Sequence, residues 1–214
     1  DALPILSRSF TDITNHGWAR NILNALYSKG IMINTGANTF GTDDVETRGE
    51  FASLLVKGLN IPLNYDNNNT FYDVVPSAVS GTWSYKYIET AARAGIVNGL
   101  SEGFFSPDGK LSREEAAVMI ARALELALPT NDIKLDASLA KSFLDSASIG
   151  YYAKPAVSAV NKAKIMTGAP VTVTGSTKTF YNFNPKSYLT RAEAGKIAVE
   201  LLKKSTKLFP KNLS

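Results

Sequence analysis

The chain contains no cysteine among its 214 residues and only one histidine, His16. Without cysteine there can be no disulfide bond, no thiolate-bound zinc ion and no cysteine nucleophile. A lone histidine close to an aromatic residue, here Trp18, is more typical of a loop than of a metal ligand or a catalytic base. The sequence also lacks a run of 18 apolar residues, so we expect no membrane-spanning helix. We predict no metal ion and no cofactor, and the lack of cysteine suits an extracytoplasmic bacterial protein as well as a cytosolic one.

The charge balance is weakly basic, with 23 lysine and arginine residues against 19 aspartate and glutamate residues. A positive net charge favours an acidic partner. The basic residues do not form a stripe interleaved with aromatic residues, and the sequence contains no recognised nucleic-acid-binding motif. We therefore expect an acidic partner other than nucleic acid.

One short pattern occurs three times: a hydroxyl residue, an arginine, a variable residue and a glutamate. The three copies are Thr47–Glu50, Ser112–Glu115 and Thr190–Glu193. A hydroxyl residue three positions before a glutamate predicts a helix capping box, in which each side chain accepts a hydrogen bond from the other residue's backbone N–H. Each copy opens a run of apolar residues at helical spacing. The pattern therefore predicts three helix starts.

The arginine inside each copy is not explained by helix formation. The first turn of a helix carries partial positive charge, which disfavours a cation by ~0.3–1 kcal/mol. A helix N-terminus with an arginine beside it is instead well suited to bind an anion. Arg48, Arg113 and Arg191 are therefore candidates for contacts with an anionic ligand. The simpler alternative is that each arginine pairs with a nearby acidic residue, such as Glu46, Asp108 or Glu114.

The pattern belongs to a longer internal repeat. Trp18 and Trp83 are 65 residues apart, and the capping boxes that follow them have the same spacing. A third copy begins at Tyr152 and carries an insertion of nine residues, which we place within Ala169–Thr179. The predicted repeats span residues 1–66, 67–132 and 133–214.

Each repeat reads as helix, loop, helix, so we predict a mainly α fold in which the three repeats share one core. Gly30 and Gly95 follow the first helices of their repeats and suit a left-handed C-terminal cap, whereas the third repeat has Lys164 there. A Phe-x-Asp motif precedes each first helix, and its aspartate is predicted to cap a helix or turn. These aspartates are Asp12, Asp73 and Asp145. Two polar stretches are predicted to be linkers, Asn60–Thr70 and Pro129–Lys141.

The second repeat combines several motifs: Phe71-x-Asp73, Trp83, Gly95-Ile96-Val97-Asn98-Gly99, Phe105-Ser106-Pro107 and Leu111-Ser112-Arg113-Glu114-Glu115. A unit of this kind resembles the S-layer homology (SLH) domain, and the resemblance covers about Phe10 to Lys204. The resemblance implies three helix-loop-helix SLH repeats in a pseudo-threefold, spindle-like arrangement around a central helical bundle. Ligand-binding grooves are then expected between neighbouring repeats.

The resemblance also implies a function, which is non-catalytic anchoring of an S-layer or surface protein to the bacterial envelope. The usual ligand of such trimers is an anionic secondary cell-wall polymer that carries a pyruvate ketal on N-acetylmannosamine. The expected location is therefore extracellular, at the cell wall or S-layer. We expect the chain to be a monomer whose three repeats form a pseudo-trimer.

The implied anion contacts, with the glutamates that position them, are Arg48, Arg113, Arg191, Glu50, Glu115 and Glu193. Gly99 and Gly168 lack a side chain and are expected to let the backbone approach the sugar. Asn34 adds a side chain at the equivalent place in the first repeat. Trp18 and Trp83 are candidates for the aromatic platform of a sugar ring, although core packing explains a tryptophan equally well.

Two other functions deserve comparison with anchoring. A glycosidase needs two carboxyl groups that face one bond, ~5–9.5 Å apart, whereas each motif glutamate belongs to its own capping box. We therefore predict that the chain is not an enzyme. The second alternative is a self-assembly module, for which exposed loop tips such as Phe104 and Tyr181 would supply the contacts.

Overall fold

The computed structural model describes residues 10–78 and 80–205. It is mainly helical, with one two-stranded antiparallel sheet. The α-helices are α1 Gly17–Ser28, α2 Arg48–Gly58, α3 Tyr85–Arg93, α4 Arg113–Ala123, α5 Ile133–Ser142, α6 Lys154–Lys162 and α7 Arg191–Lys204. The short 3-10 helices are Ile13–Asn15, Ser146–Ser148 and Tyr151–Ala153, and the strands are β1 Ala169–Val171 and β2 Phe180–Asn182. Within the described residues, no helix combines the length and the apolar character needed to cross a membrane.

All three predicted capping boxes are present, at the starts of α2, α4 and α7. In α2 the Thr47 hydroxyl accepts from the Glu50 N–H at 3.1 Å, and the Thr47 N–H donates to the Glu50 carboxylate at 3.4 Å. The same pair of bonds joins Ser112 to Glu115 and Thr190 to Glu193. The sequence pattern therefore predicts the first residue of each of these helices correctly.

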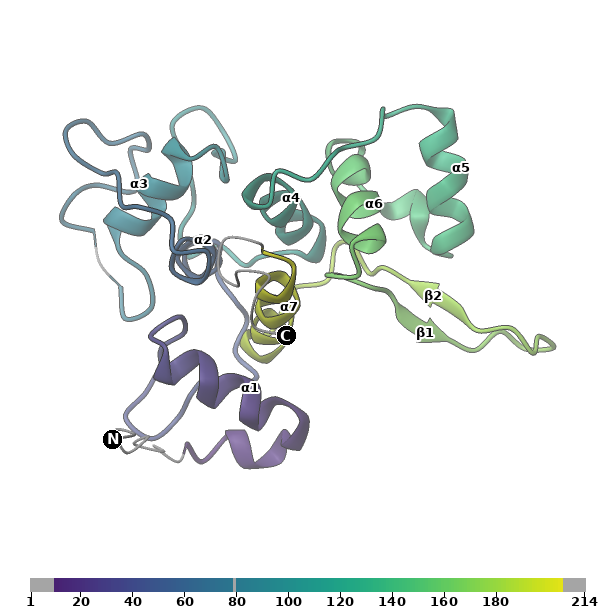
Figure 1. The fold of residues 1–214 in the computed structure, drawn as a ribbon, viewed down its shortest axis with the longest axis horizontal. Coiled ribbons are helices and arrows are strands. Elements are labelled where there is room, and N and C mark those ends of the chain that lie inside the picture. The colour runs from purple at the N-terminus through teal and green to yellow at the C-terminus, as the bar shows by residue number, and fades with distance from the viewer. Residues whose placement is uncertain (1–9, 79, 206–214) are drawn as a thin grey trace, which may run out of the picture. The chain divides into compact units, whose positions relative to one another are not determined.

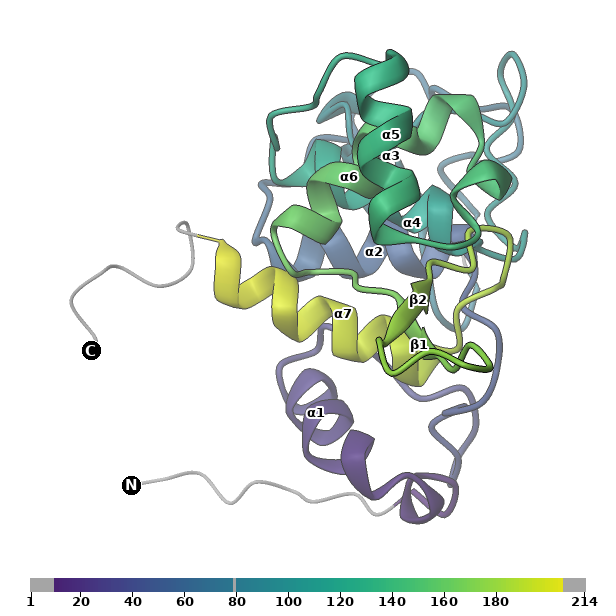
Figure 2. The ribbon, with the colours of Figure 1, turned by 90° about the vertical axis from the view of Figure 1, so that its right-hand side faces the viewer.

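The chain divides into two compact units, and the first of them is built from two segments that are separated in the sequence by the second unit. Unit 1 comprises residues 1–110 and 189–214, and unit 2 comprises residues 111–188. Within unit 1, α2 packs against α3, and α7 packs against both α1 and α2 (Figure 1). Within unit 2, α6 packs against both α4 and α5 (Figure 2). In each unit the second helix of one repeat therefore lies against the first helix of another repeat.

The Phe-x-Asp aspartates hold the loop between the two helices of their own repeat. Asp12 accepts from the N–H groups of Phe40, Gly41 and Thr42, Asp73 from those of Phe105 and Ser106, and Asp145 from those of Phe183 and Asn184. Burial opposes ionisation of Asp12, but its backbone hydrogen bonds prevail and lower the pKa of the carboxyl. The predicted turn-capping role of these aspartates is confirmed.

The first helices end as their glycines predict. Gly30 and Gly95 have φ of 68° and 73°, and Lys164 takes the same left-handed conformation with φ of 58°. Lys164 therefore occupies a conformation that costs a residue with a side chain ~1–2 kcal/mol.

Two segments differ from the predicted secondary structure. The stretch Pro129–Lys141, predicted as a linker, contains most of α5, whose N-terminus is capped by the Asp132 side chain. Leu135 and Leu139 are one helical turn apart and both are buried, so the short helix is stabilised by packing rather than by a long apolar pattern. The insertion predicted within Ala169–Thr179 forms a hairpin, in which Val171 pairs with Phe180.

Candidate functional site

Each motif arginine reaches the inter-helix loop of a different repeat and lies over the phenylalanine of that loop. The guanidinium carbon lies 4.8 Å from the ring centroid for Arg48 over Phe105, 5.1 Å for Arg113 over Phe183 and 5.1 Å for Arg191 over Phe40. The first repeat thus contacts the second, the second contacts the third, and the third contacts the first. These cation–π contacts explain why the arginine recurs, because each one ties a helix start to a neighbouring loop.

Backbone carbonyls accept hydrogen bonds from the same arginines. Arg48 Nε donates to the Phe105 carbonyl at 2.9 Å, and its Nη2 donates to the Asn98 carbonyl at 3.3 Å. Arg113 repeats this arrangement with Phe183 at 2.8 Å and Thr167 at 3.1 Å. Of the acids considered as simpler partners, Asp108 accepts from Trp83 Nε1, and Glu114 accepts from Gly150, Tyr152 and Lys186.

Arg191 is bound differently, because carboxylates surround it. Its Nη1 donates to Glu50 at 2.8 Å and lies 3.8 Å from Glu46, and its Nη2 donates to the Ile33 carbonyl. The Arg191 Nε is buried and has no hydrogen-bond partner in the described structure. The third arginine is thus paired with an acid of the first repeat, Glu50, and not with an acid close to it in the sequence.

The pKa values of the two glutamates beside Arg191 are shifted in opposite directions. Burial and the neighbouring charge of Glu50 raise the pKa of Glu46 well above its usual value. Burial also opposes ionisation of Glu50, but the hydrogen bond with Glu46 and the charge of Arg191 lower its pKa. Of the pair, Glu46 therefore keeps its proton to higher pH, and Glu50 is the acid that ionises more readily beside Arg191.

The arginines differ in how much of the side chain reaches solvent. Arg48 and Arg191 are only 4% and 2% exposed, whereas Arg113 is partly exposed. Of the three, Arg113 is therefore the one with the most surface for direct contact with a ligand.

The two tryptophans occupy equivalent positions but different environments. Trp83 is 8% exposed and donates from its indole N–H to Asp108 at 2.8 Å. It packs on Gly49, where an added Cβ would lie 2.9 Å from the ring. Trp18 is the equivalent of Trp83 in the first repeat, and it is 51% exposed. The residue that corresponds to Gly49 in the third repeat is Ala192, which has a Cβ. Core packing accounts for Trp83, whereas Trp18 is half exposed and has the Lys196 ammonium 5.7 Å from its ring centroid.

The remaining candidates serve the local structure. A Cβ at Gly99 would lie 2.5 Å from the Phe104 carbonyl oxygen, and one at Gly168 would lie 2.8 Å from that of Asn182. Both glycines are therefore required by the chain's own loops, whatever ligand approaches them. The Asn34 side chain donates to the Gly36 carbonyl at 2.7 Å. The described residues contain no group of three or more His, Asp or Glu side chains able to hold a metal ion.

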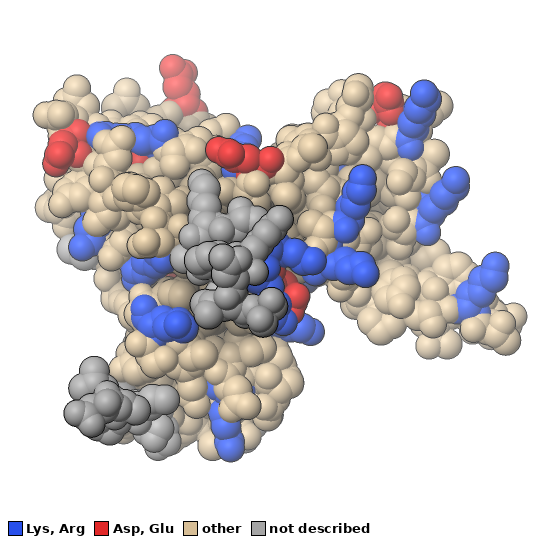
Figure 3. All heavy atoms as spheres, in the orientation of Figure 1, with Lys and Arg blue, Asp and Glu red and all other residues tan. Residues whose placement is uncertain are grey.

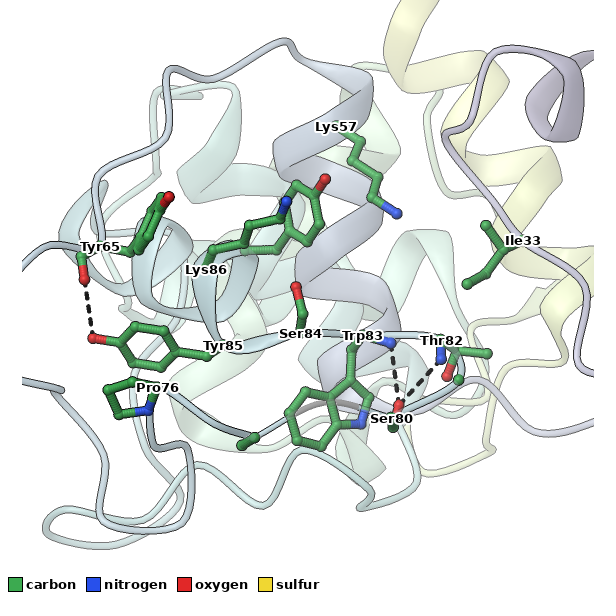
Figure 4. A pocket seen from close by; sticks show the side chains of 13 residues that line it. Ile33, Lys57, Tyr65, Pro76, Ser80, Thr82, Trp83, Ser84, Tyr85 and Lys86 are labelled. Atoms are coloured by element: carbon green, nitrogen blue, oxygen red, sulfur yellow. Dashed lines mark hydrogen bonds between the residues drawn. The ribbon is translucent and has the colours of Figure 1, made fainter.

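A groove of about 500 Å³ lies in unit 1, beside the start of α3 (Figure 4). Its lining includes Trp83, Tyr85 and Tyr87 together with Lys57 and Lys86. A smaller cavity that contains Glu46, Glu50 and Arg191 shares some of this lining, namely Ile33, Lys57 and Thr82. The groove is thus aromatic and basic on one side and adjoins the buried Arg191 cluster on the other.

Sequence reasoning missed the two groove lysines. They lie within predicted helices, where a lysine is normally read as a solvated surface residue. The only signal in the sequence was that Lys86 follows Trp83 by three residues, and nothing in the sequence places Lys57 near them. On the face of the molecule seen in Figure 3, basic side chains outnumber acidic ones and stand mostly apart from one another.

The SLH domain profile matches this chain three times, over residues 9–52, 77–117 and 142–194. These segments contain the capping boxes, the arginines and most of the loops described above.

The chain belongs to the S-layer homology domain family.

Relatives of the SLH chain include enzymes and surface proteins. Exoglucanase XynX of Acetivibrio thermocellus is 32% identical over 202 residues, which cover 94% of this chain and 17% of the relative. An S-layer protein of Bacillus licheniformis is 28% identical over 94% of this chain and 20% of its own length. A cellulosome-anchoring protein of Acetivibrio thermocellus is 29% identical over 56% of this chain and 26% of its own length. The SLH chain spans less than a fifth of the length of three curated relatives that are named as enzymes.

Proposed function

We propose that this SLH chain anchors a larger protein to the bacterial cell surface by binding an anionic cell-wall polysaccharide. Membership of the SLH family supports the proposal, as do relatives named as an S-layer protein and a cellulosome-anchoring protein. The specific ligand in this proposal is a secondary cell-wall polymer with pyruvylated N-acetylmannosamine, and the location is extracellular. The proposal also makes the chain a non-catalytic part of a larger protein, which is supported by the match of relatives named as enzymes through an SLH segment.

The observation that carries the proposal is the recurrence of one arginine environment in three repeats. Each guanidinium lies over a loop phenylalanine, and a guanidinium is suited to bind the carboxylate of a pyruvyl group through paired N–H donors. In this proposal the partly exposed Arg113 contacts the carboxylate directly. Arg48 and Arg191 are more deeply buried, so they act mainly by holding the loops that border the ligand.

The proposal includes the arrangement that the SLH resemblance implies, with repeats at residues 1–66, 67–132 and 133–214 related by pseudo-threefold symmetry in a monomer. The cyclic order of the arginine contacts supports it, because each repeat supplies an arginine and a loop in the same way.

Self-assembly through protein contacts is the competing function. Tyr72 and Phe104 are 73% and 49% exposed, and their ring centroids lie 5.7 Å apart at a loop tip. Tyr181 is 43% exposed in the hairpin of unit 2. Such a tip would bind protein rather than a charged sugar.

The test is calorimetric titration with methyl glycosides of N-acetylmannosamine, one pyruvylated and one not. We expect binding of the pyruvylated sugar alone. Arg113→Ala should weaken this binding by ~10-fold or more, as expected for lost charge-assisted hydrogen bonds. Arg20→Ala, which removes an exposed arginine from α1, is the matched control and should bind like the unaltered chain.

Binding of neither sugar, combined with concentration-dependent self-association in sedimentation, would overturn the anchoring proposal in favour of assembly. Equal binding of both sugars would show that the carboxylate is not recognised.

A further inference from the structure

Two ammonium groups meet at one aromatic ring in the groove of unit 1. Lys57 projects from α2 and Lys86 from the first turn of α3 (Figure 4). Their Nζ atoms lie 4.7 Å and 5.1 Å from the centroid of the Tyr87 ring. Tyr87 therefore brings two positive charges from different repeats to the same wall of the groove.

In the part of the chain that the structure describes, neither of these charges is paired with a carboxylate. The groove lining contains no aspartate or glutamate within the described residues, and neither Lys57 nor Lys86 forms an ion pair there. Burial and the charge of Lys86 lower the pKa of the Lys57 ammonium. An anion in the groove would offset both effects, because it would restore a favourable partner to each ammonium.

Other groups in the groove suit a sugar that carries such an anion. The Ser84 hydroxyl is buried and makes no hydrogen bond in the described structure, although Ser84 is the N-cap residue of α3. It remains available to donate to, or accept from, a bound hydroxyl or carboxylate. The partly exposed Tyr87 supplies aromatic surface, which commonly packs against apolar faces of ligands.

The lysine pair is specific to this groove among the three repeats. At the position of Lys57 the second and third repeats have Arg122 and Glu200, and at the position of Lys86 the first and third have Asn21 and Pro155. The repeat periodicity therefore does not require the pair, and an equivalent pair of lysines occurs in neither of the other copies.

We infer that Lys57 and Lys86, with Ser84, form a binding site for an anionic group of a saccharide in the groove of unit 1. The site is separate from the motif arginines, two of which are buried and all of which donate to backbone carbonyls or protein carboxylates. The inference rests on the proposed function and deepens it, because it assigns residues of unit 1 that take a carboxylate or phosphate group of the wall polysaccharide, in addition to Arg113 in unit 2.

The test compares Lys57→Gln, Lys86→Gln and the double variant with Lys29→Gln, which removes an exposed lysine at the end of α1. Pyruvylated N-acetylmannosamine methyl glycoside and inorganic phosphate are the two probes, and they distinguish a saccharide carboxylate from a simple phosphate. We expect each single groove variant to bind the saccharide ~10-fold more weakly, and the double variant more weakly still, with no change for Lys29→Gln. Thermal unfolding of each variant checks that the fold is retained.

Side-chain nitrogen resonances of the unaltered chain provide a second measurement. Both probes should shift the signals of Lys57 and Lys86, and the saccharide should leave that of Lys29 in place. If the chain binds the saccharide but the groove variants match Lys29→Gln, the inference is wrong and the proposed function stands. If the saccharide does not bind but phosphate shifts the two groove signals selectively, the site stands and the proposed polysaccharide ligand is wrong. If neither probe shifts these signals, the lysine site is overturned.

Discussion

The residue before each capping box differs between the first repeat and the other two. It is Glu46 in the first repeat and Leu111 and Leu189 in the others, and all three are at most 1% exposed. A leucine contributes ~1.5–3 kcal/mol when fully buried, whereas a buried carboxyl needs hydrogen bonds to offset its lost hydration. The Glu50 carboxyl lies beside Glu46 and raises its pKa, and Glu50 in turn pairs with Arg191. One substitution in a repeated core position thus accounts for the different surroundings of the third arginine.

Glu46 should make the folded chain less stable as the pH rises. Its pKa is raised in the folded state, so the folded chain holds a proton that the unfolded chain releases above about pH 4.5. Stability from this group is therefore full below that pH and is lost as the pH rises toward the folded pKa. Glu46→Gln keeps a neutral hydrogen-bonding side chain and should unfold at the same urea concentration as the unaltered chain near pH 4. Its advantage should grow as the pH rises above about 4.5, and parallel curves for the two proteins would contradict a raised pKa of Glu46.

At the scale of single elements, the helix starts were predictable and their partners were not. A capping box involves only four consecutive residues, so Thr47 and Glu50 identify the first turn of α2 without knowledge of the rest of the chain. The role of Arg48 depends instead on Phe105, 57 positions away, which only the folded chain brings close. The proximity of Lys57 and Lys86 was not predictable for the same reason, because in the sequence each resembles a solvated lysine on its own helix.

The elements that were missed are short and local. The signals available for α5 were its cap, Asp132, and the buried pair Leu135 and Leu139. A helix of only 10 residues offers too few apolar positions for its periodicity to stand out from a polar composition. The hairpin of β1 and β2 has three residues per strand, and its Ala169–Val171 strand contains a proline. Strands this short carry little alternation, so the insertion was predicted only as a longer loop.

The end of α6 offers a test of the repeat at the level of one helix terminus. Lys164→Gly removes the left-handed strain of ~1–2 kcal/mol. The greater freedom of glycine in the unfolded chain reduces this gain in stability by ~0.5–1 kcal/mol. We expect a net gain of about 0.5 kcal/mol in the free energy of unfolding, measured by urea denaturation. Lys164→Ala removes the same charge but keeps a Cβ, so it should give no gain. A gain of equal size in both variants would assign the effect to the charge rather than to the backbone.

At the scale of the whole chain, the two ends of the sequence contribute to one unit. Helix α7 follows unit 2 in sequence, yet it packs in unit 1 against α1 and α2. Gly195 allows this close approach, since a Cβ there would lie 2.8 Å from a methyl carbon of Leu23 and 3.3 Å from one of Leu26. Sequence periodicity identifies three repeats, but it does not reveal that the last helix completes the structure of the first repeat.

A chain that ends at Tyr188 should therefore lose structure near its other end. Without α7 the side chains of Leu23 and Leu26, 0% and 2% exposed, lose their cover, and each buried leucine is worth ~1.5–3 kcal/mol. Hydrogen exchange followed by mass spectrometry should show that amides of α1 lose protection, while those of α4 and α6 in unit 2 keep it. A chain that ends at Ser205 retains α7 and should keep α1 protected. Undiminished protection of α1 in the shorter chain would mean that the first repeat folds without the last helix. The contacts of α7 with the first repeat would then be a consequence of folding rather than a condition for it.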